Sequence, residues 1–288
     1  MDCRCLAETL VRMATKIATW IFIALATVIA AMHSAAVLAG GATPKAEDIL
    51  GRAAQYQREF RAGDMAVVPD YVAMLEAATR AEPENADLWY AMGRAYLLQG
   101  ARAMLAGGNP ADAMPAMQKG PAALKRALQI NPDHPLALAQ LGGVQALMTS
   151  MLNQPALATQ GVADMNRAAQ LAPDSTMVRL TRAFLGLSLP DSLRNHASEF
   201  ADLDFLIEGA EWGAAADYVR ILRGDLFFET GQPAQARADY RSVAGAGSAA
   251  TITANKRLLA LDQGGVAMAD IKALRTAAGA QCAMCHGR

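Results

Sequence analysis

Three segments of the chain share one arrangement of small, apolar and acidic positions around a proline. The segments are centred on Pro83, Pro132 and Pro173, and each has an alanine five residues before the proline and an acid directly after it. Proline cannot continue a helix, because it lacks a backbone N–H and its ring clashes with the preceding turn. We therefore expect a helix to end before each proline and a second helix to begin beyond it, with the acid near its N-terminus.

The positions beyond these prolines repeat a pattern of large and small side chains. A large residue stands six positions after each of the first two prolines, and a glycine follows four residues later. A fourth copy lacks the proline but keeps two glycines seven residues apart. The matching positions are Trp89, Gly93, Tyr96 and Gly100 in the first copy, Leu138, Leu141 and Gly142 in the second, and Gly224, Gly231, Ala236 and Tyr240 in the fourth.

This pattern resembles the tetratricopeptide repeat over about residues 50–245. In that family each unit is a helical hairpin, in which small residues allow two helices to pack closely and large residues fill the space opposite. The resemblance implies an all-α fold, a solenoid of helical hairpins over residues 44–245, with a concave surface that binds a peptide or another protein. The low content of β-branched and aromatic residues independently favours helices.

The spacing departs from that family. Pro83 and Pro132 are 49 residues apart and Pro132 and Pro173 are 41 apart, whereas the repeat has a period of about 34 residues. The surplus lies between the two helices of each unit, so either the helices are extended or the loops are long. The pattern fades between residues 178 and 211, where Pro190 separates two helical stretches. An irregular helical bundle is the alternative fold.

Residues 1–39 have the layout of an export signal. Arg4, Arg12 and Lys16 precede an uncharged apolar run from Ile17 to Met32, and small residues follow up to Ala39. This order is typical of a secretory signal peptide cleaved before Gly40. The alternative is an uncleaved membrane anchor, because the apolar stretch is long enough to span a bilayer. Both interpretations place the remaining chain outside the cytoplasm, in the periplasm, and only the second attaches it to a membrane.

Composition narrows the class of protein. Hydrophobic residues make up 53% of the 288 residues and charged residues 18%, with a formal net charge of −1. A disordered chain needs low hydrophobicity and high net charge, and a dedicated nucleic-acid binder needs a basic excess, so neither class fits. Beyond residue 39 the only cysteines are Cys282 and Cys285, which excludes a scaffold held by several disulfides.

The candidate chemistry lies at the C-terminal end of the sequence. Cys282, Cys285 and His286 form a Cys-x-x-Cys-His motif, which is the attachment pattern of c-type haem. Residues i and i+3 share one face of a helical turn, so both thiols reach vinyl groups on one edge of the porphyrin. The adjacent imidazole then serves as the proximal iron ligand. We therefore predict one covalent haem c, held by Cys282 and Cys285 and ligated by His286.

Several alternatives remain open at this tail. A disulfide explains Cys282 and Cys285 but not His286, and a zinc site needs further ligands from distant parts of the chain. The region 249–288 is expected to contain a helix over Ala267–Ala278 that leads into the motif and has Ile271 and Leu274 on its apolar side. Met268 is a candidate distal iron ligand, and His134 and His196 are weaker candidates; the iron could also be five-coordinate. The acidic stretch of Glu199, Asp202, Asp204 and Glu208 is expected to be a solvated helix face.

These observations support the hypothesis that the protein docks a partner on its repeat surface and transfers one electron through its haem. The expected partner is a redox protein. The alternative is a cofactor-free periplasmic adaptor, such as a scaffold for cytochrome c assembly or for an envelope complex, in which Cys282 and Cys285 form a thiol pair. A haem peroxidase or gas-binding protein is the third hypothesis. No distal acid–base residue is recognisable, so we do not expect an enzyme.

Overall fold

The computed structural model describes residues 45–61, 65–105, 110–152, 155–186, 189, 191–209, 215–246 and 250–263. These residues form eleven α-helices, α2 to α12, and two short 3₁₀-helices, and they contain no β-strand. The predicted all-α class is therefore confirmed. Within the same ranges, no helix combines the length and the hydropathy needed to cross a membrane.

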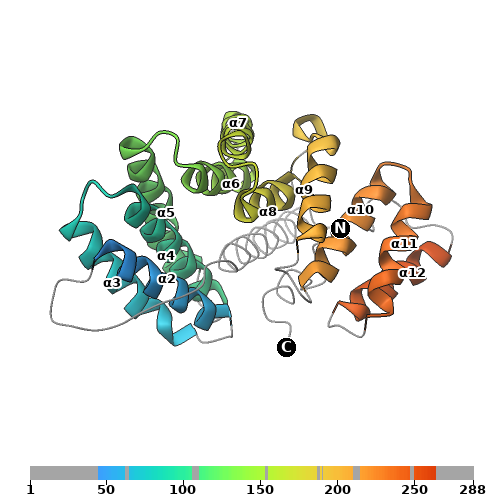
Figure 1. Ribbon diagram of the computed structural model, residues 1–288, viewed down its shortest axis with the longest axis horizontal. Coiled ribbons are helices and arrows are strands. Elements are labelled where there is room, and N and C mark those ends of the chain that lie inside the picture. The colour runs from blue at the N-terminus through green and yellow to red at the C-terminus, as the bar shows by residue number, and fades with distance from the viewer. Residues whose placement is uncertain are drawn as a thin grey trace, which may run out of the picture. The chain divides into compact units, whose positions relative to one another are not determined.

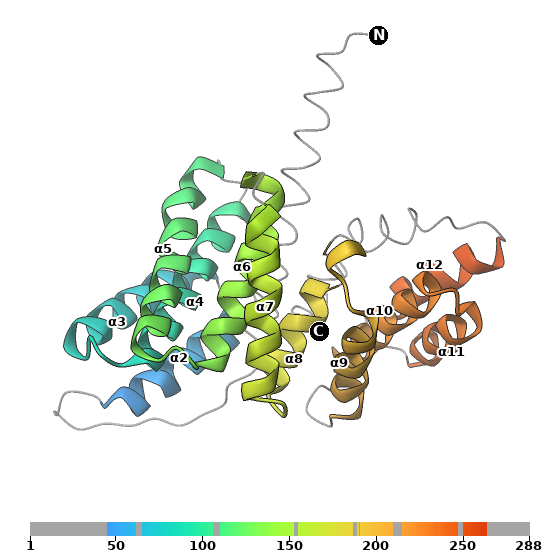
Figure 2. The ribbon, with the colours of Figure 1, turned by 90° about the horizontal axis from the view of Figure 1, so that it is seen from above.

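The chain divides into two compact units, and the boundary follows Thr181 within α8 (Thr176–Gly186). The N-terminal unit contains the described residues from 45 to 181. The C-terminal unit contains those from 182 to 263. Both units consist of consecutive helices that pack against their neighbours in sequence (Figures 1 and 2).

The N-terminal unit is a row of helical hairpins (Figure 2). The first two helices are connected through the 3₁₀-helix η1, and the later pairs pack along their full lengths. The hairpins are α2 (Ala46–Arg61) with η1 (Met65–Val67) and α3 (Val68–Ala81), α4 (Ala86–Leu105) with α5 (Pro110–Ile130), and α6 (Pro135–Leu152) with α7 (Pro155–Leu171).

Extended helices, and not long loops, account for the surplus between the prolines. Helices α4 and α5 contain 20 and 21 residues, and α6 and α7 contain 18 and 17. The shorter hairpin in the C-terminal unit has helices of 15 and 12 residues. The additional helical turns of the longer hairpins lie at the ends remote from the proline turns.

The three proline turns have the form that the sequence predicts. Residues 82–85, 131–134 and 172–175 separate consecutive helices, with the proline at the second position of each turn. The fourth position supplies the N-cap: the side chains of Asn85, His134 and Ser175 each accept a hydrogen bond from the backbone N–H three residues later, at 3.2–3.4 Å. Each cap satisfies one of the N–H groups that has no partner within its helix.

The acid after the proline reaches across to the next hairpin. Glu84 pairs with Arg126 on α5 at 2.5 Å, and Asp133 pairs in the same way with Arg167 on α7. All four side chains are more than a third exposed, and exposed pairs contribute only about 0.2–1 kcal/mol each. Each pair therefore connects a turn to the second helix after it and adds little to the stability of the unit.

Glycines mark the points where the helices of a hairpin cross. A Cβ atom on Gly93 would lie 2.7 Å from Leu124 Cγ on the facing helix, and one on Gly142 would lie 2.5 Å from the carbonyl oxygen of Gly161. Contacts this short do not occur in proteins, so a larger residue requires the helices to separate. The small positions in the sequence pattern thus mark close helix packing.

One buried cluster of the N-terminal unit joins its first two hairpins, and a separate cluster joins α6, α7 and α8. The residues of the first cluster come from α2, η1, α3, α4 and α5. Tyr71, Leu75, Leu88, Met92 and Leu98 are each at most 2% exposed. Burial of one such side chain stabilises a fold by about 1.5–3 kcal/mol, so this cluster stabilises the first two hairpins.

The C-terminal unit repeats the hairpin arrangement in a shorter form. Its elements are the end of α8, η2 (Asp191–Leu193), α9 (His196–Glu208), α10 (Ala215–Glu229), α11 (Pro233–Ala244) and α12 (Thr251–Asp262). Gly224 on α10 faces the ring of Tyr240 on α11, since an added Cβ would lie 2.5 Å from Tyr240 Cε1. Gly231 takes a positive φ of 76° in the turn between these helices, a conformation that glycine adopts without strain.

Buried ion pairs connect the helices of the C-terminal unit. Four arginines each bind carboxylates on other helices or turns, and most of these carboxylates are inaccessible to solvent. The pairs are Arg182 with Asp202, Arg194 with Glu199 and Glu229, Arg223 with Asp204 and Asp239, and Arg257 with Asp225.

Glu208 is exposed and the Asp204 side chain is 49% exposed, as a solvated acidic face requires, but the expectation is wrong for Glu199 and Asp202. Their exposed fractions are only 3% and 0%. Arg194 donates two hydrogen bonds to Glu199 and Arg182 donates two to Asp202, at 2.6–3.0 Å. Paired guanidinium groups compensate the desolvation of a carboxylate, so these acids lie inside the unit.

Candidate functional site

The predicted haem ligands lie outside the described residues. This applies to Cys282, Cys285 and His286, to the candidate distal ligand Met268 and to the helix predicted over Ala267–Ala278. Within the part of the chain that the structure describes, no group of three or more His, Cys, Asp or Glu side chains is arranged to hold a metal ion. The haem site therefore stays a prediction from the sequence.

The two weaker candidates for a distal iron ligand are both engaged in hydrogen bonds. His134 Nδ1 accepts from the backbone N–H of Ala137, so its Nε2 carries the proton and donates to Asp87 at 3.0 Å. Both ring nitrogens of this buried histidine are thus occupied. His196 bonds Glu199 through Nδ1 at 3.0 Å, and 46% of its side chain is exposed.

A small cavity opens where the first helices of the three N-terminal hairpins meet. We call the surface formed by α2, α4 and α6 the A face. The cavity has a volume of about 130 Å³, which is well below the roughly 300–1,000 Å³ of small-molecule sites. A haem does not fit it, whereas one or two side chains of a bound peptide do. Its lining consists of Leu50, Ala53, Ala54, Asp87, Tyr90, Ala91, Arg94 and Leu136.

A chain of polar contacts forms one wall of this cavity. The Tyr90 ring lies 5.2 Å from the His134 ring between centroids, and the Tyr90 hydroxyl accepts a hydrogen bond from Arg94 Nη1 at 3.3 Å. The Arg94 side chain, on a residue only 3% exposed, also lies over the Tyr90 ring. These contacts hold Tyr90 in one position, so the cavity is preformed.

The charges at the cavity are fixed by the same contacts. The hydrogen bond from His134, which outweighs the effect of partial burial, lowers the pKa of Asp87 below its ordinary value. Burial raises the pKa of Tyr90, so its hydroxyl stays protonated at neutral pH. The A face therefore combines an apolar hollow with an ionised carboxylate, a phenol and a guanidinium. An apolar hollow with a few fixed polar groups is typical of a binding site.

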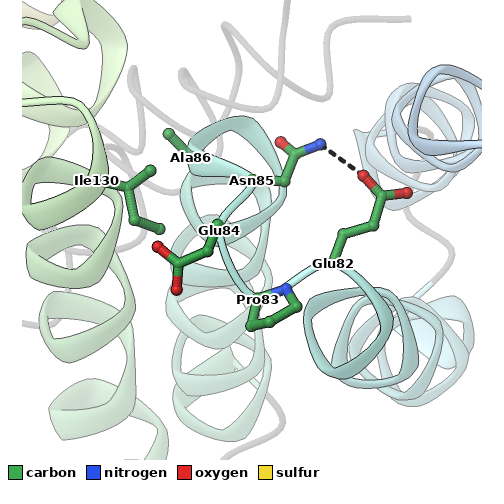
Figure 3. Close-up of a pocket in the computed structure, with 6 residues that line it drawn as sticks. All are labelled: Glu82, Pro83, Glu84, Asn85, Ala86 and Ile130. Atoms are coloured by element: carbon green, nitrogen blue, oxygen red, sulfur yellow. Dashed lines mark hydrogen bonds between the residues drawn. The ribbon is translucent and has the colours of Figure 1, made fainter.

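A second, wider hollow lies at the turn between α3 and α4 (Figure 3). Its volume is about 500 Å³, and its lining residues are Glu82, Pro83, Glu84, Asn85, Ala86 and Ile130. Asn85 donates to Glu82 at 3.0 Å, and Glu84 points toward α5, where Arg126 binds it. Its polar groups therefore stabilise the turn, and the A face is the better candidate for binding.

The titratable cluster of the C-terminal unit has the properties of a structural network. Burial raises the pKa of Glu199, but hydrogen bonds from Arg194 and His196 outweigh this effect and leave the pKa below its ordinary value. A general base works best with a pKa near the operating pH, and Glu199 has the opposite property. The same guanidinium also binds Glu229 at 2.9 Å.

Comparison with protein-family models gives no match to this chain. Comparison with the curated proteins gives no significantly similar sequence.

The sequence analysis missed the A-face cavity and the buried ion pairs. The cavity had one signal that could have been used: Tyr90 and Arg94 stand four residues apart in an otherwise apolar stretch of α4, a spacing that places both on one side of a helix. The ion pairs had no comparable signal. Their partners are separated by as many as 35 residues along the chain.

Proposed function

We propose that the chain is an exported helical-repeat protein that docks a protein partner on its A face and carries one c-type haem near its C-terminal end. The observation that carries this proposal is the Cys-x-x-Cys-His motif on a chain whose first 39 residues are patterned for export. Covalent haem attachment takes place outside the cytoplasm, so the two features agree.

The side chains of the Cys-x-x-Cys-His motif fit a covalently attached haem. Cys282 and Cys285 provide thiols that form thioethers with the two vinyl groups, and His286 provides an imidazole for the iron. A covalently bound haem supplies reversible one-electron transfer. No further metal ligand is needed from the described residues, which is consistent with their hydrogen-bonded histidines.

The hairpin architecture supports the docking half of the proposal. Helices α2, α4 and α6 face the same cavity, and helical repeats of the tetratricopeptide type bind their partners along such a face. The partly buried leucines Leu50 and Leu136 would cover an apolar side chain of the partner, while Asp87, whose side chain is 67% exposed, limits which residues can flank it. A docked redox protein would thereby be held close to the tail haem.

Absorbance spectroscopy with pyridine tests the haem. The full chain, produced in a host that attaches haem c, is denatured in alkaline pyridine, and we expect one covalently retained haem per chain. The control is the Cys282→Ala/Cys285→Ala variant, which keeps His286 but cannot form a thioether. The absence of haem from the wild-type protein under these conditions would refute the electron-transfer proposal.

The second candidate is the cofactor-free adaptor, and the preformed A-face cavity favours it independently, since the cavity does not involve the tail. Intact mass distinguishes the two. A haem adds a defined mass to the chain, whereas a disulfide between Cys282 and Cys285 removes two hydrogen atoms. A chain with the disulfide and no haem would leave the adaptor as the function.

Site-specific photo-crosslinking tests the docking face under either candidate. A photoreactive residue at position 50 or 136, on the A face, should crosslink the partner in the periplasm, and one at position 114 on α5 serves as the control. Met114 is 43% exposed, so the control is accessible to other proteins. Equal crosslinking at all three positions would argue against the A face.

A further inference from the structure

The last described helix, α12, has large apolar side chains on its outer side. Ile252 is 68% exposed and Leu259 is 58% exposed, and they are the most exposed large hydrophobic residues of the described chain. The opposite side of α12 is buried, through Thr253, Ala254 and Arg257. Residues seven apart lie on one face of a helix, so Ile252 and Leu259 form one apolar stripe about 10 Å long.

A comparison with the other helices shows that α12 has fewer neighbouring helices among the described residues. Three helices that begin a hairpin contact both the helix before them and the helix after them: α4 contacts α3 and α5, α6 contacts α5 and α7, and α10 contacts α9 and α11. Within the described residues, α12 makes extensive contact only with the helix before it, α11. The stripe of Ile252 and Leu259 is therefore not covered by another described helix.

The chain continues for 25 residues beyond Gln263. The helix predicted over Ala267–Ala278 has Ile271 and Leu274 on its apolar side, and Ala267 and Ala278 extend that side at helical spacing. Four residues, two of them glycines, separate it from the end of α12. Connections of two to eight residues join antiparallel neighbours in helical proteins.

We infer that residues 267–278 pack against the Ile252–Leu259 stripe and form a final hairpin with α12. In this hairpin, Ile271 and Leu274 cover the two exposed side chains. Cys282 then follows the second helix of the hairpin by four residues. The inference goes beyond the proposed function and does not depend on a haem, because none of the packing residues belongs to the attachment motif.

Hydrogen exchange measured by mass spectrometry on the full chain tests the hairpin. In the wild-type protein, we expect amides of residues 267–278 to exchange at least about tenfold more slowly than in an unstructured peptide. In the Ile252→Glu/Leu259→Glu variant this protection should be lost, while the amides of α10 and α11 keep theirs. Glutamate is tolerated on an exposed helix face, so α12 itself should remain folded.

Leu171→Glu is the matched control, because Leu171 is also exposed, at 43%, but belongs to the N-terminal unit. This variant should leave the protection of residues 267–278 unchanged. Rapid exchange of this segment in the wild-type protein would overturn the inference. So would protection that survives Ile252→Glu/Leu259→Glu, or protection that appears only at concentrations where the chain dimerises, since a second copy would then cover the stripe. The Cys282→Ala/Cys285→Ala variant, which cannot attach haem, should show the wild-type protection.

Discussion

The crossing of α6 and α7 makes the substitution Gly161→Ala the sharpest test of the fold. A Cβ atom at position 161 would lie 2.3 Å from the carbonyl oxygen of Gly142 and 3.3 Å from the backbone nitrogen of Ala146. Ordinary van der Waals contacts begin at 3.4 Å, so the shortest contact is too close by 1.1 Å. The obstructing atoms belong to the backbone, and the two helices must therefore move apart.

The magnitude follows from two opposing contributions. Overpacking of a tight core costs about 1–3 kcal/mol, and the rigid backbone at this crossing favours the upper end of that range. Replacing glycine by alanine inside a helix returns up to about 1 kcal/mol through helix propensity. We expect Gly161→Ala to lower the free energy of unfolding by about 2 kcal/mol.

Chemical denaturation followed by circular dichroism measures this change. Helical repeats need not unfold in a single step, so hydrogen exchange of the α6 and α7 amides should locate the loss in this hairpin. The control is Gly245→Ala, where the nearest atom to an added Cβ is 3.7 Å away and stability should stay equal or rise by a few tenths of a kcal/mol. If Gly161→Ala is as stable as the wild-type protein, the close crossing is not present in solution.

Three further predictions concern the polar contacts. Asp225→Asn leaves the buried Arg257 without its charged partner and should lower the free energy of unfolding by about 3–5 kcal/mol, measured by denaturation. His134→Ala removes the cap of α6 and should lower the free energy of unfolding by about 1 kcal/mol. His134→Asn can still cap the helix and should recover most of this loss. Equal melting temperatures for the two variants would contradict the capping role. The lowered pKa of Glu199 means that its ionised form stabilises the fold above the ordinary carboxyl pKa and that this contribution is lost as the pH falls through the lowered pKa. In denaturation series below about pH 5, stability should therefore decline more steeply for the wild-type protein than for Glu199→Gln. Parallel declines would show that the pKa of Glu199 is the same in the folded and unfolded states and would contradict this prediction.

The sequence predicts the features that single residues control locally. Pro83, Pro132 and Pro173 mark turns because the proline ring prevents helix continuation at those positions, whatever surrounds it. Gly93 and Gly224 mark helix crossings because no other residue permits so short an approach. These effects act within one or two helical turns of the chain, which is why the hairpins are recognisable without tertiary information.

The features that the sequence did not predict depend on tertiary packing between helices that are distant in sequence. The A-face cavity requires Leu50 and Leu136 to come together from helices almost ninety residues apart. The burial of Glu199 and Asp202 depends on arginines placed by the tertiary fold, and a carboxylate that looks solvated in sequence becomes internal once it is paired. The predicted haem ligands are the reverse case, because a motif of five consecutive residues predicts them without tertiary information.

The unequal helix lengths of the N-terminal hairpins have a consequence for modularity. The capped turns and their arginine contacts lie at one end of each hairpin, and the variation in length is confined to the other end. Insertion of whole helical turns into both arms at the tip between α4 and α5 would therefore extend the hairpin's reach without disturbing the register of its neighbours. The length of one edge of the hairpin can therefore change while the opposite edge, which contains the capped turns, stays the same.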